Sequence, residues 1–299
     1  MARPAVNDPV AMRVAAVAAA LGVCLAATLK LEAARSGAGR APRDVVAGMV
    51  RIPAGAYRPL YNPPESPRDR SARQASTRPA RQRRVEAFDV DAFAVTNGEY
   101  LAFVREHPEW QRSHARKLFV DEAYLRQWAG DLEPGENAPL DAPVVSVSWF
   151  AARAYLKAQG KQLPTVDQWE YVAAASETER DASRSPAMLE RLRVWYGRPT
   201  PAVLPPVTSG LRNVYGVTGL HGLIWEWTLD FNSSLVTGES RADSSLDRSL
   251  YCGAGAAAAS DFEDYAAFMR YAFRASLEAR YSVPNLGFRG VRAIQKDQP

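Results

Sequence analysis

The segment "GLHGLIWEWTLDFN", residues 219–232, places Glu226 between two tryptophans, with His221 five residues upstream. A carboxyl group enclosed by large aromatic side chains has a raised pKa if it lacks a partner, and it can then accept a proton in catalysis. The competing interpretation is a structural role for Glu226, because glycines and tryptophans at this spacing also build an ordered loop core. Glu226 is therefore a candidate catalytic residue with a structural alternative.

A second candidate site is the acidic cluster that precedes two arginines. Three carboxyl groups fall within four residues, at Asp261, Glu263 and Asp264. If 261–273 is helical, Arg270 and Arg274 share a face and can hold a substrate carboxylate in bidentate fashion. The alternative is a helix whose acids favour its N-terminus and whose arginines cover the surface. As catalytic candidates in this segment we name Asp261, Glu263, Asp264 and Arg274.

Soft donors for a copper ion are scarce in this sequence. A site would need imidazole, thiolate or thioether groups, and the candidates are His221, Cys252 and Met269. Cys24 lies inside the N-terminal apolar segment, so Cys252 has no partner for a disulfide within the rest of the chain. A buried, inert thiol is the alternative for Cys252. Copper is a cofactor consistent with these donors, although no ligand spacing indicates it.

The elements that must position these residues are short. Alternation of apolar and polar residues predicts strands at 49–61 and 83–96,. Thr96 with Glu99, and Thr165 with Gln168, have the spacing of capping boxes and predict two helix starts. Further helices are expected from 146 to a stop at Gly160, and over the ranges 185–195 and 260–273. The fold class is therefore α+β, a single domain with much ordered loop.

Composition excludes some classes of protein. With 47% apolar residues and seven tryptophans in 299 residues, the chain can bury a substantial core and is not disordered,. Seven arginines crowd into 67–84, but no aromatic residues are interleaved with them. We expect a solvated loop there, and no nucleic acid as a partner.

The N-terminus predicts export. Arg3 and Arg13 precede sixteen residues without a charge, 14–29, and Lys30 closes the segment. This run is an export signal or a membrane anchor, so residues 1–44 form the signal or anchor and its tether, and 45–299 form the domain. The domain is expected in the periplasm or at the outer face of the cytoplasmic membrane.

Five segments, in order, resemble the sulfatase-modifying factor family, whose founding members are the formylglycine-generating enzymes. They are "MVRIPAGAY", "FDVDAFAVTNGEYLAFV", "PVVSVSWFAARAYLKAQGKQLPTVDQWEYVAAAS", "NVYGVTGLHGLIWEWTLD" and "NLGFRGVRA", and they span residues 49–294. The resemblance implies a formylglycine-generating-enzyme-like fold, related to the C-type lectins. By analogy with that fold, His221, Cys252 and Met269 come from segments that converge.

The chain departs from the family at two functional positions. Formylglycine-generating enzymes carry a cysteine pair upstream of an arginine, and those thiols bind copper and exchange with the substrate cysteine. If Arg274 matches that arginine, the thiol positions fall near Asp261 and Ala266, so dithiol copper chemistry is not expected. Leu223 replaces the usual asparagine of a calcium site, which makes calcium an unlikely cofactor.

The pattern around residues 252–289 resembles a separate branch of the family, found among nitrite-reductase accessory proteins and near a protein that completes the pyoverdine chromophore. The resemblance implies an exported, oxidation-type maturation or accessory factor that acts on an exported protein or a small-molecule substrate. One alternative is a non-catalytic binding or assembly factor for a periplasmic enzyme, such as a copper enzyme. A weaker alternative is a formylglycine-generating oxidase, which the absent thiols disfavour.

Overall fold

The computed structural model describes residues 48–59, 82–232 and 265–294, all within the compact unit Val45–Pro299. No helix among these residues is both long and apolar enough to cross a membrane. Two predicted segments lie outside the described residues. They are the signal or anchor at 14–29 and the arginine-rich run up to residue 81. The division into 1–44 and 45–299 therefore stays a prediction.

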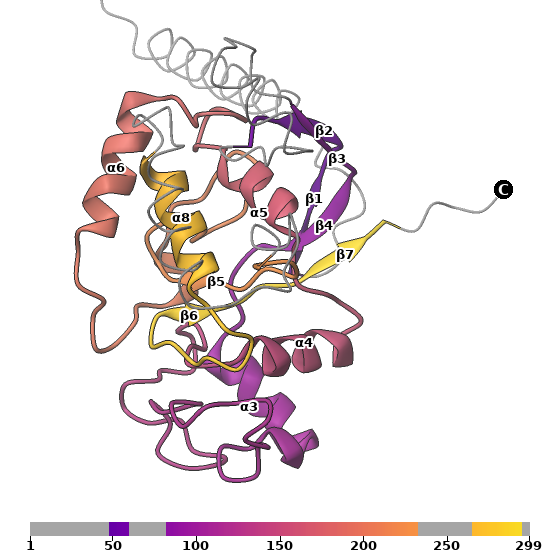
Figure 1. Cartoon of the computed structure of the whole chain (residues 1–299), viewed down its shortest axis with the longest axis vertical. Coiled ribbons are helices and arrows are strands. Elements are labelled where there is room, and N and C mark those ends of the chain that lie inside the picture. The colour runs from indigo at the N-terminus through magenta and orange to yellow at the C-terminus, as the bar shows by residue number, and fades with distance from the viewer. Residues whose placement is uncertain (1–47, 60–81, 233–264, 295–299) are drawn as a thin grey trace, which may run out of the picture. The chain divides into compact units, whose positions relative to one another are not determined.

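Three strands form the largest sheet, in which every pairing is antiparallel (Figure 1). In spatial order they are β1 (Met49–Ile52), β4 (Phe88–Asp91) and β7 (Val291–Ala293). Val90 on the central strand faces Val50 on one side and Val291 on the other. Such β-branched cross-strand neighbours favour this register. The sheet therefore joins the beginning and the end of the described chain.

Two smaller sheets complete the β structure. The antiparallel pair is β2 (Gly55–Tyr57) with β3 (Arg83–Val85), and the parallel pair is β5 (Trp225–Glu226) with β6 (Leu286–Gly287). At Gly287 a Cβ atom would collide with the backbone carbonyl oxygen of Val144, so this position requires glycine,. The pairing of β5 with β6 fixes Glu226 within the interior.

Both predicted capping boxes are present. Thr96 caps α3 (Asn97–Glu106), and its hydroxyl accepts from the Glu99 amide while the Glu99 carboxylate accepts from the Thr96 amide. Thr165 and Gln168 make the same reciprocal bonds at the start of α5 (Val166–Ala173). Both helix starts therefore follow from local sequence.

The other predicted helices also form. They are α4 (Trp149–Ala158), α6 (Pro186–Tyr196) and α8 (Tyr265–Ala275), with short 3₁₀ turns η1 (Pro108–Trp110) and η2 (Val207–Ser209). Gly160 follows α4 with φ of +65°, a conformation that suits a glycine stop,. Helices α6 and α8 lie side by side (Figure 1). The mixture of short strands, helices and long ordered loops confirms the α+β prediction.

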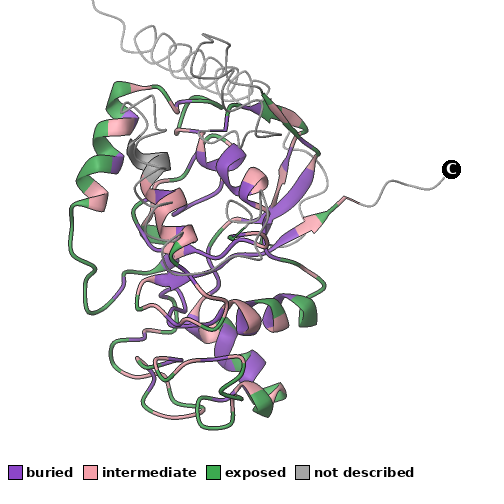
Figure 2. Cartoon of the chain, viewed as in Figure 1, coloured by how far each residue is buried: buried purple, intermediate pink, exposed green. Residues whose placement is uncertain are grey.

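The core is divided between two main clusters of buried side chains. One surrounds α3 and α4 and includes Tyr100, Trp128 and Phe288. The other packs α5 against the three-stranded sheet and includes Trp169, Phe88 and Val291. Figure 2 shows buried residues along α5, β1 and β4, with exposed residues on the outer side of α6. Helix α5 therefore supplies buried side chains to the second cluster, and the candidate site lies beside this helix.

Candidate functional site

Three of the predicted site residues gather around Trp169 of α5. The indole Nε1 donates a hydrogen bond of 2.8 Å to Glu226 Oε2. The His221 ring meets the indole edge to face at 5.7 Å between centroids. The guanidinium carbons of Arg274 and Arg270 lie 4.9 and 5.7 Å from the centre of the Trp169 ring, within cation–π range,. The structure thus brings Glu226, His221 and Arg274 together.

Glu226 is bound by a partner that the sequence did not indicate. Arg289 donates through Nε at 2.8 and 3.0 Å and through Nη2 at 2.8 Å, and neither side chain is exposed. Arg289 also donates to the backbone carbonyl oxygens of Asp91 and Thr218. Glu226 could act as a proton acceptor only if its carboxyl group were unpaired. Its pairing with Arg289 instead favours a structural role for Glu226.

Glu170, the neighbour of Trp169, accepts from both arginines of α8. Arg270 donates through Nε at 3.0 and 3.1 Å and through Nη2 at 2.7 Å, and Arg274 donates through Nη1 at 2.6 Å. Burial alone would raise the pKa of Glu170, but the charges of Arg270 and Arg274 lower it to about 2,. Arg270 and Arg274 do share a helix face, and the carboxylate that they hold belongs to the chain itself.

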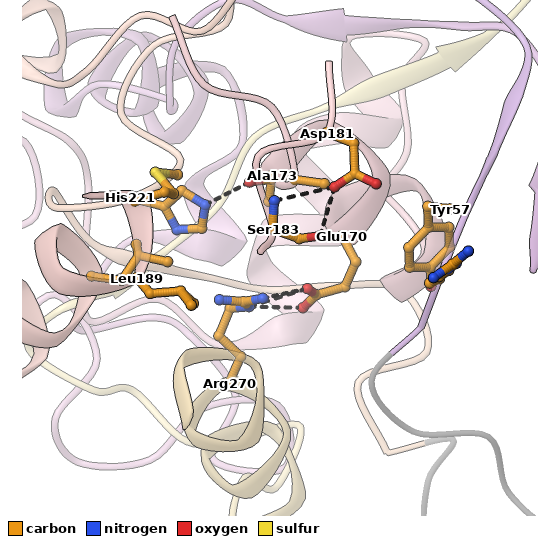
Figure 3. A pocket seen from close by; sticks show the side chains of 12 residues that line it. Tyr57, Glu170, Ala173, Asp181, Ser183, Leu189, His221 and Arg270 are labelled. Carbon is orange, nitrogen blue, oxygen red and sulfur yellow. Dashed lines mark hydrogen bonds and ion pairs between the residues drawn. The ribbon is translucent and has the colours of Figure 1, made fainter. Parts of the chain in front are cut away.

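His221 is 9% exposed and lies beside a small cavity (Figure 3). Its Nε2 is 2.8 Å from the backbone carbonyl oxygen of Ala173, while Nδ1 has no hydrogen-bond partner among the residues that the structure describes. Burial, followed by the nearby charge of Arg270, lowers the pKa of His221 to about 4. The imidazole is therefore neutral at pH 7.

Four half-buried aromatic side chains lie next to the arginines and form what we call the aromatic shelf: Trp195, Tyr196, Trp225 and Phe273. The rings of Trp225 and Tyr196 are stacked at 5.2 Å, and those of Trp225 and Phe273 at 4.5 Å. Tyr196 also accepts a 3.3 Å hydrogen bond from Arg270 Nη1. Planar apolar surface and cationic donors therefore meet at one place.

The remaining predicted site residues are not brought into this group. Cys252, Asp261, Glu263 and Asp264 lie outside the described residues, and their roles stay predictions. Met269 is half-buried on α8. Within 48–59, 82–232 and 265–294, no group of three or more His, Cys, Asp or Glu side chains is arranged to hold a metal ion. His221 Nδ1 is a suitable copper donor, but these residues do not supply a full ligand set.

The expectation that calcium is an unlikely cofactor stays a prediction. Leu223 packs in a buried apolar cluster, and the other members of this cluster include Leu204, Val207 and Ile224. An apolar side chain offers no oxygen to a hard cation.

Comparison with known proteins decides the family. Residues 35–294 match the model of the sulfatase-modifying factor enzyme 1-like domain. The chain belongs to this family. It is 30% identical to the inactive Cα-formylglycine-generating enzyme 2 of Bos taurus, over 60% of this chain and 69% of that protein. Hercynine oxygenase of Mycobacterium tuberculosis is 28% identical over 50% of this chain and 39% of its own length.

PvdO from Pseudomonas aeruginosa is a solved structure that resembles this chain, with a TM-score of 0.44 at 18% identity, covering 82% of this chain and 94% of that one. Through hercynine oxygenase, the sulfatase-modifying factor family includes an oxidation-type relative of this chain. Its own sequence contains two cysteines, Cys24 and Cys252, and only Cys252 follows the N-terminal apolar segment.

Sequence reasoning missed Trp169, Glu170 and Arg289 as members of the site. One signal was present, because the dipeptide Trp-Glu occurs both at 169–170 and at 225–226. The tryptophan of the first dipeptide donates to the glutamate of the second. No local pattern indicates the pairing with Arg289, which lies 63 residues from Glu226.

Proposed function

We propose that this member of the sulfatase-modifying factor family is an exported maturation or accessory factor that promotes oxidation of a protein or small-molecule partner without dithiol copper chemistry. The observation that carries the proposal is the aromatic shelf beside the Glu170, Arg270 and Arg274 assembly. Stacked rings and guanidinium groups together suit a planar, anionic group of a partner. The family's oxidation-type relatives support the reaction class, and the single cysteine after residue 30 argues against a thiol pair.

Export is part of this proposal. Its support is the uncharged run at 14–29 with Arg3 and Arg13 before it,. A fusion of residues 1–44 to a reporter enzyme that is active only outside the cytoplasm gives activity if the segment exports. A reporter that remains inactive contradicts the proposed location.

Oxygen uptake tests the proposed chemistry. The full-length protein, with its metal content measured, is mixed with the small-molecule and protein fractions of a periplasmic extract while dissolved O₂ is recorded. We expect uptake that depends on one fraction and falls at least tenfold in Arg274→Gln. Arg280→Gln is the matched control, because Arg280 is an exposed arginine from the loop that follows α8.

The second candidate function is a non-catalytic binding or assembly factor. It is favoured by the pairing of both buried glutamates, Glu170 and Glu226, with arginines, which leaves neither as a free acid or base. Under this alternative the wild-type protein binds a partner stoichiometrically and consumes no O₂ with any fraction. That result, with Arg274→Gln losing the partner and Arg280→Gln retaining it, replaces the oxidation proposal.

The formylglycine-generating alternative has its own test. A peptide with a sulfatase-type cysteine motif is incubated with the protein and copper, and the cysteine is followed by mass spectrometry. We expect the peptide to remain unchanged. Conversion of its cysteine to an aldehyde overturns the proposal that this chain works without a thiol pair.

A further inference from the structure

A cavity of about 40 Å³ lies between α5, α6 and α8, beside the site but separate from the aromatic shelf. Its polar lining includes His221, Arg270 and Glu170, and Leu189 forms part of its apolar wall. In Figure 3 the Arg270 guanidinium turns one end to Glu170 and the other toward Leu189 and His221. By this measure the volume holds about three water-sized groups.

The protonation state of His221 follows from its one hydrogen bond. The carbonyl oxygen of Ala173 is an acceptor only, so the proton of the neutral ring lies on Nε2,. Nδ1 therefore carries a lone pair, and it is a buried acceptor that no described residue satisfies. Leaving a buried acceptor unsatisfied is unfavourable. Because His221 lines the cavity, this lone pair is the candidate acceptor for a ligand that can donate.

Among the described residues, the charge next to His221 is positive and unbalanced. Glu170 contributes one negative charge, while Arg270 and Arg274 contribute two positive charges, and all three side chains are at most 10% exposed. No other carboxylate among the described residues forms an ion pair with either arginine. Buried charge without compensation is unfavourable, so an anion at this place is stabilised.

Arg270 has donors to spare for such an anion. A guanidinium has five N–H groups, and the described contacts engage three of them, one on each nitrogen. The acidic residue on the cavity lining other than Glu170 is Asp181, which is exposed and accepts from the Ser183 hydroxyl and amide. Solvent screens that charge far better than it screens the buried arginines.

We propose that the cavity is a binding site for a small oxyanion that retains one hydroxyl group, of the size of hydrogencarbonate. Its hydroxyl donates to His221 Nδ1, and its anionic oxygens accept from Arg270. Hydrogenphosphate also retains one hydroxyl group, with one more oxygen and one more negative charge than hydrogencarbonate, and it is the other source of such a ligand. The cavity lining includes none of the four shelf residues, but it shares Arg270 with the assembly on which the proposed function rests.

Isothermal titration of the full-length protein with three sodium salts at pH 7 and constant ionic strength tests this site. The probes are hydrogencarbonate, phosphate and nitrate. Nitrate is the sharpest control because it has the planar shape and charge of hydrogencarbonate but no hydroxyl to donate. We expect hydrogencarbonate or phosphate to bind, nitrate to bind at least tenfold more weakly, and the stronger of the first two to identify the source.

Two variants and one control locate the binding. His221→Gln can still donate to Ala173 but loses the Nδ1 acceptor, and it should weaken binding at least tenfold. Leu189→Phe fills the cavity and should weaken binding with His221 in place, which keeps the test decisive if His221→Gln does not fold. His114→Gln, at an exposed histidine, should bind as the wild type does.

Three outcomes overturn the inference. They are equal affinity for nitrate and hydrogencarbonate, undiminished binding by a folded His221→Gln or Leu189→Phe protein, and no binding of any probe by the wild type. The last outcome assigns the cavity to water alone.

Discussion

Two buried acid and arginine assemblies contact Trp169, and they differ in charge balance and in burial. Glu226 and Arg289 form a one-to-one pair with no exposed side-chain surface, and the remaining donors of Arg289 bind backbone carbonyl oxygens. Glu170 faces two arginines from α8, and those three side chains are 6 to 10% exposed. A closed, neutral pair fixes the fold, whereas an open, positively charged group can also bind a ligand.

The two assemblies also connect different parts of the chain. The first joins β5 to the segment between β6 and β7, and through Trp169 it reaches α5. The second joins α5 to α8, whose side chains also form part of the aromatic shelf. Loss of an ion pair lowers the stability of the fold most when the remaining charge is buried and cannot be solvated. The comparison therefore predicts unequal costs for equivalent substitutions.

The largest effect is expected for Arg289→Met. It leaves Glu226 buried without a cation, and breaking a buried pair in this way costs about 3 to 5 kcal/mol. Urea unfolding followed by tryptophan fluorescence measures the change in the free energy of unfolding. Arg292→Met is the matched control, because Arg292 is 40% exposed and its 3.4 Å contact with Asp89 is worth about 0.5 kcal/mol,. Equal losses in the two variants contradict the distinction.

The pH dependence of stability distinguishes the Glu170 assembly from the Glu226 pair. Because the folded pKa of Glu170 is lowered from 4.5 to about 2, its contribution is present above pH 4.5 and is lost as the pH falls toward 2,. The shift corresponds to about 3 kcal/mol. Unfolding free energies measured from pH 7 to pH 2.5 should fall less steeply below pH 4.5 in Glu170→Gln than in the wild type.

His221 contributes in a higher pH range. Its folded pKa is also lowered, from 6.5 to about 4, so stability from the neutral ring is lost as the pH falls from 6.5 to 4,. This loss should begin at the same pH in the wild type and in Glu170→Gln, but it should extend to lower pH in the variant, because the charge of Glu170 raises the pKa of His221. If Glu170→Gln keeps the full wild-type slope below pH 4.5, the pairing assigned to Glu170 is wrong.

A smaller effect is expected for Arg274→Met. Glu170 keeps Arg270 as a bidentate partner, so no charge of the opposite sign is left alone, and we expect a loss of about 1 to 2 kcal/mol,. The same urea experiment measures it beside Arg289→Met. A loss as large as that of Arg289→Met contradicts the view that Glu170 has more cationic partners than its pairing requires.

Local sequence predicted the helix starts because capping depends on residues three positions apart. Thr96 with Glu99 and Thr165 with Gln168 are confirmed for that reason. It also predicted that Arg270 and Arg274 share a face, since helical spacing decides this. It did not predict their partner, because Glu170 lies 100 residues before Arg270 and the contact depends on how α5 and α8 pack. Arg289 was missed for the same physical reason.

The smallest expected effect is that of Thr165→Ala, which removes the N-cap of α5 and with it about 1 kcal/mol of stability. The first turn should fray, but Trp169 and Glu170 in the next turn are held by Glu226 and by the arginines of α8. Hydrogen exchange should therefore become faster in the first turn of α5 and stay slow from residue 170 to residue 173.

Thr96→Ala is the matched control, because it removes the corresponding cap of α3. Among the described hydrogen bonds, no side chain of either assembly contacts α3. This variant should therefore leave hydrogen exchange in α5 unchanged. Loss of protection through the whole of α5 in Thr165→Ala has a different meaning. It shows that the cap, rather than the two acid and arginine assemblies, keeps Trp169 and Glu170 in place. The view that the two assemblies hold α5 in position is then wrong.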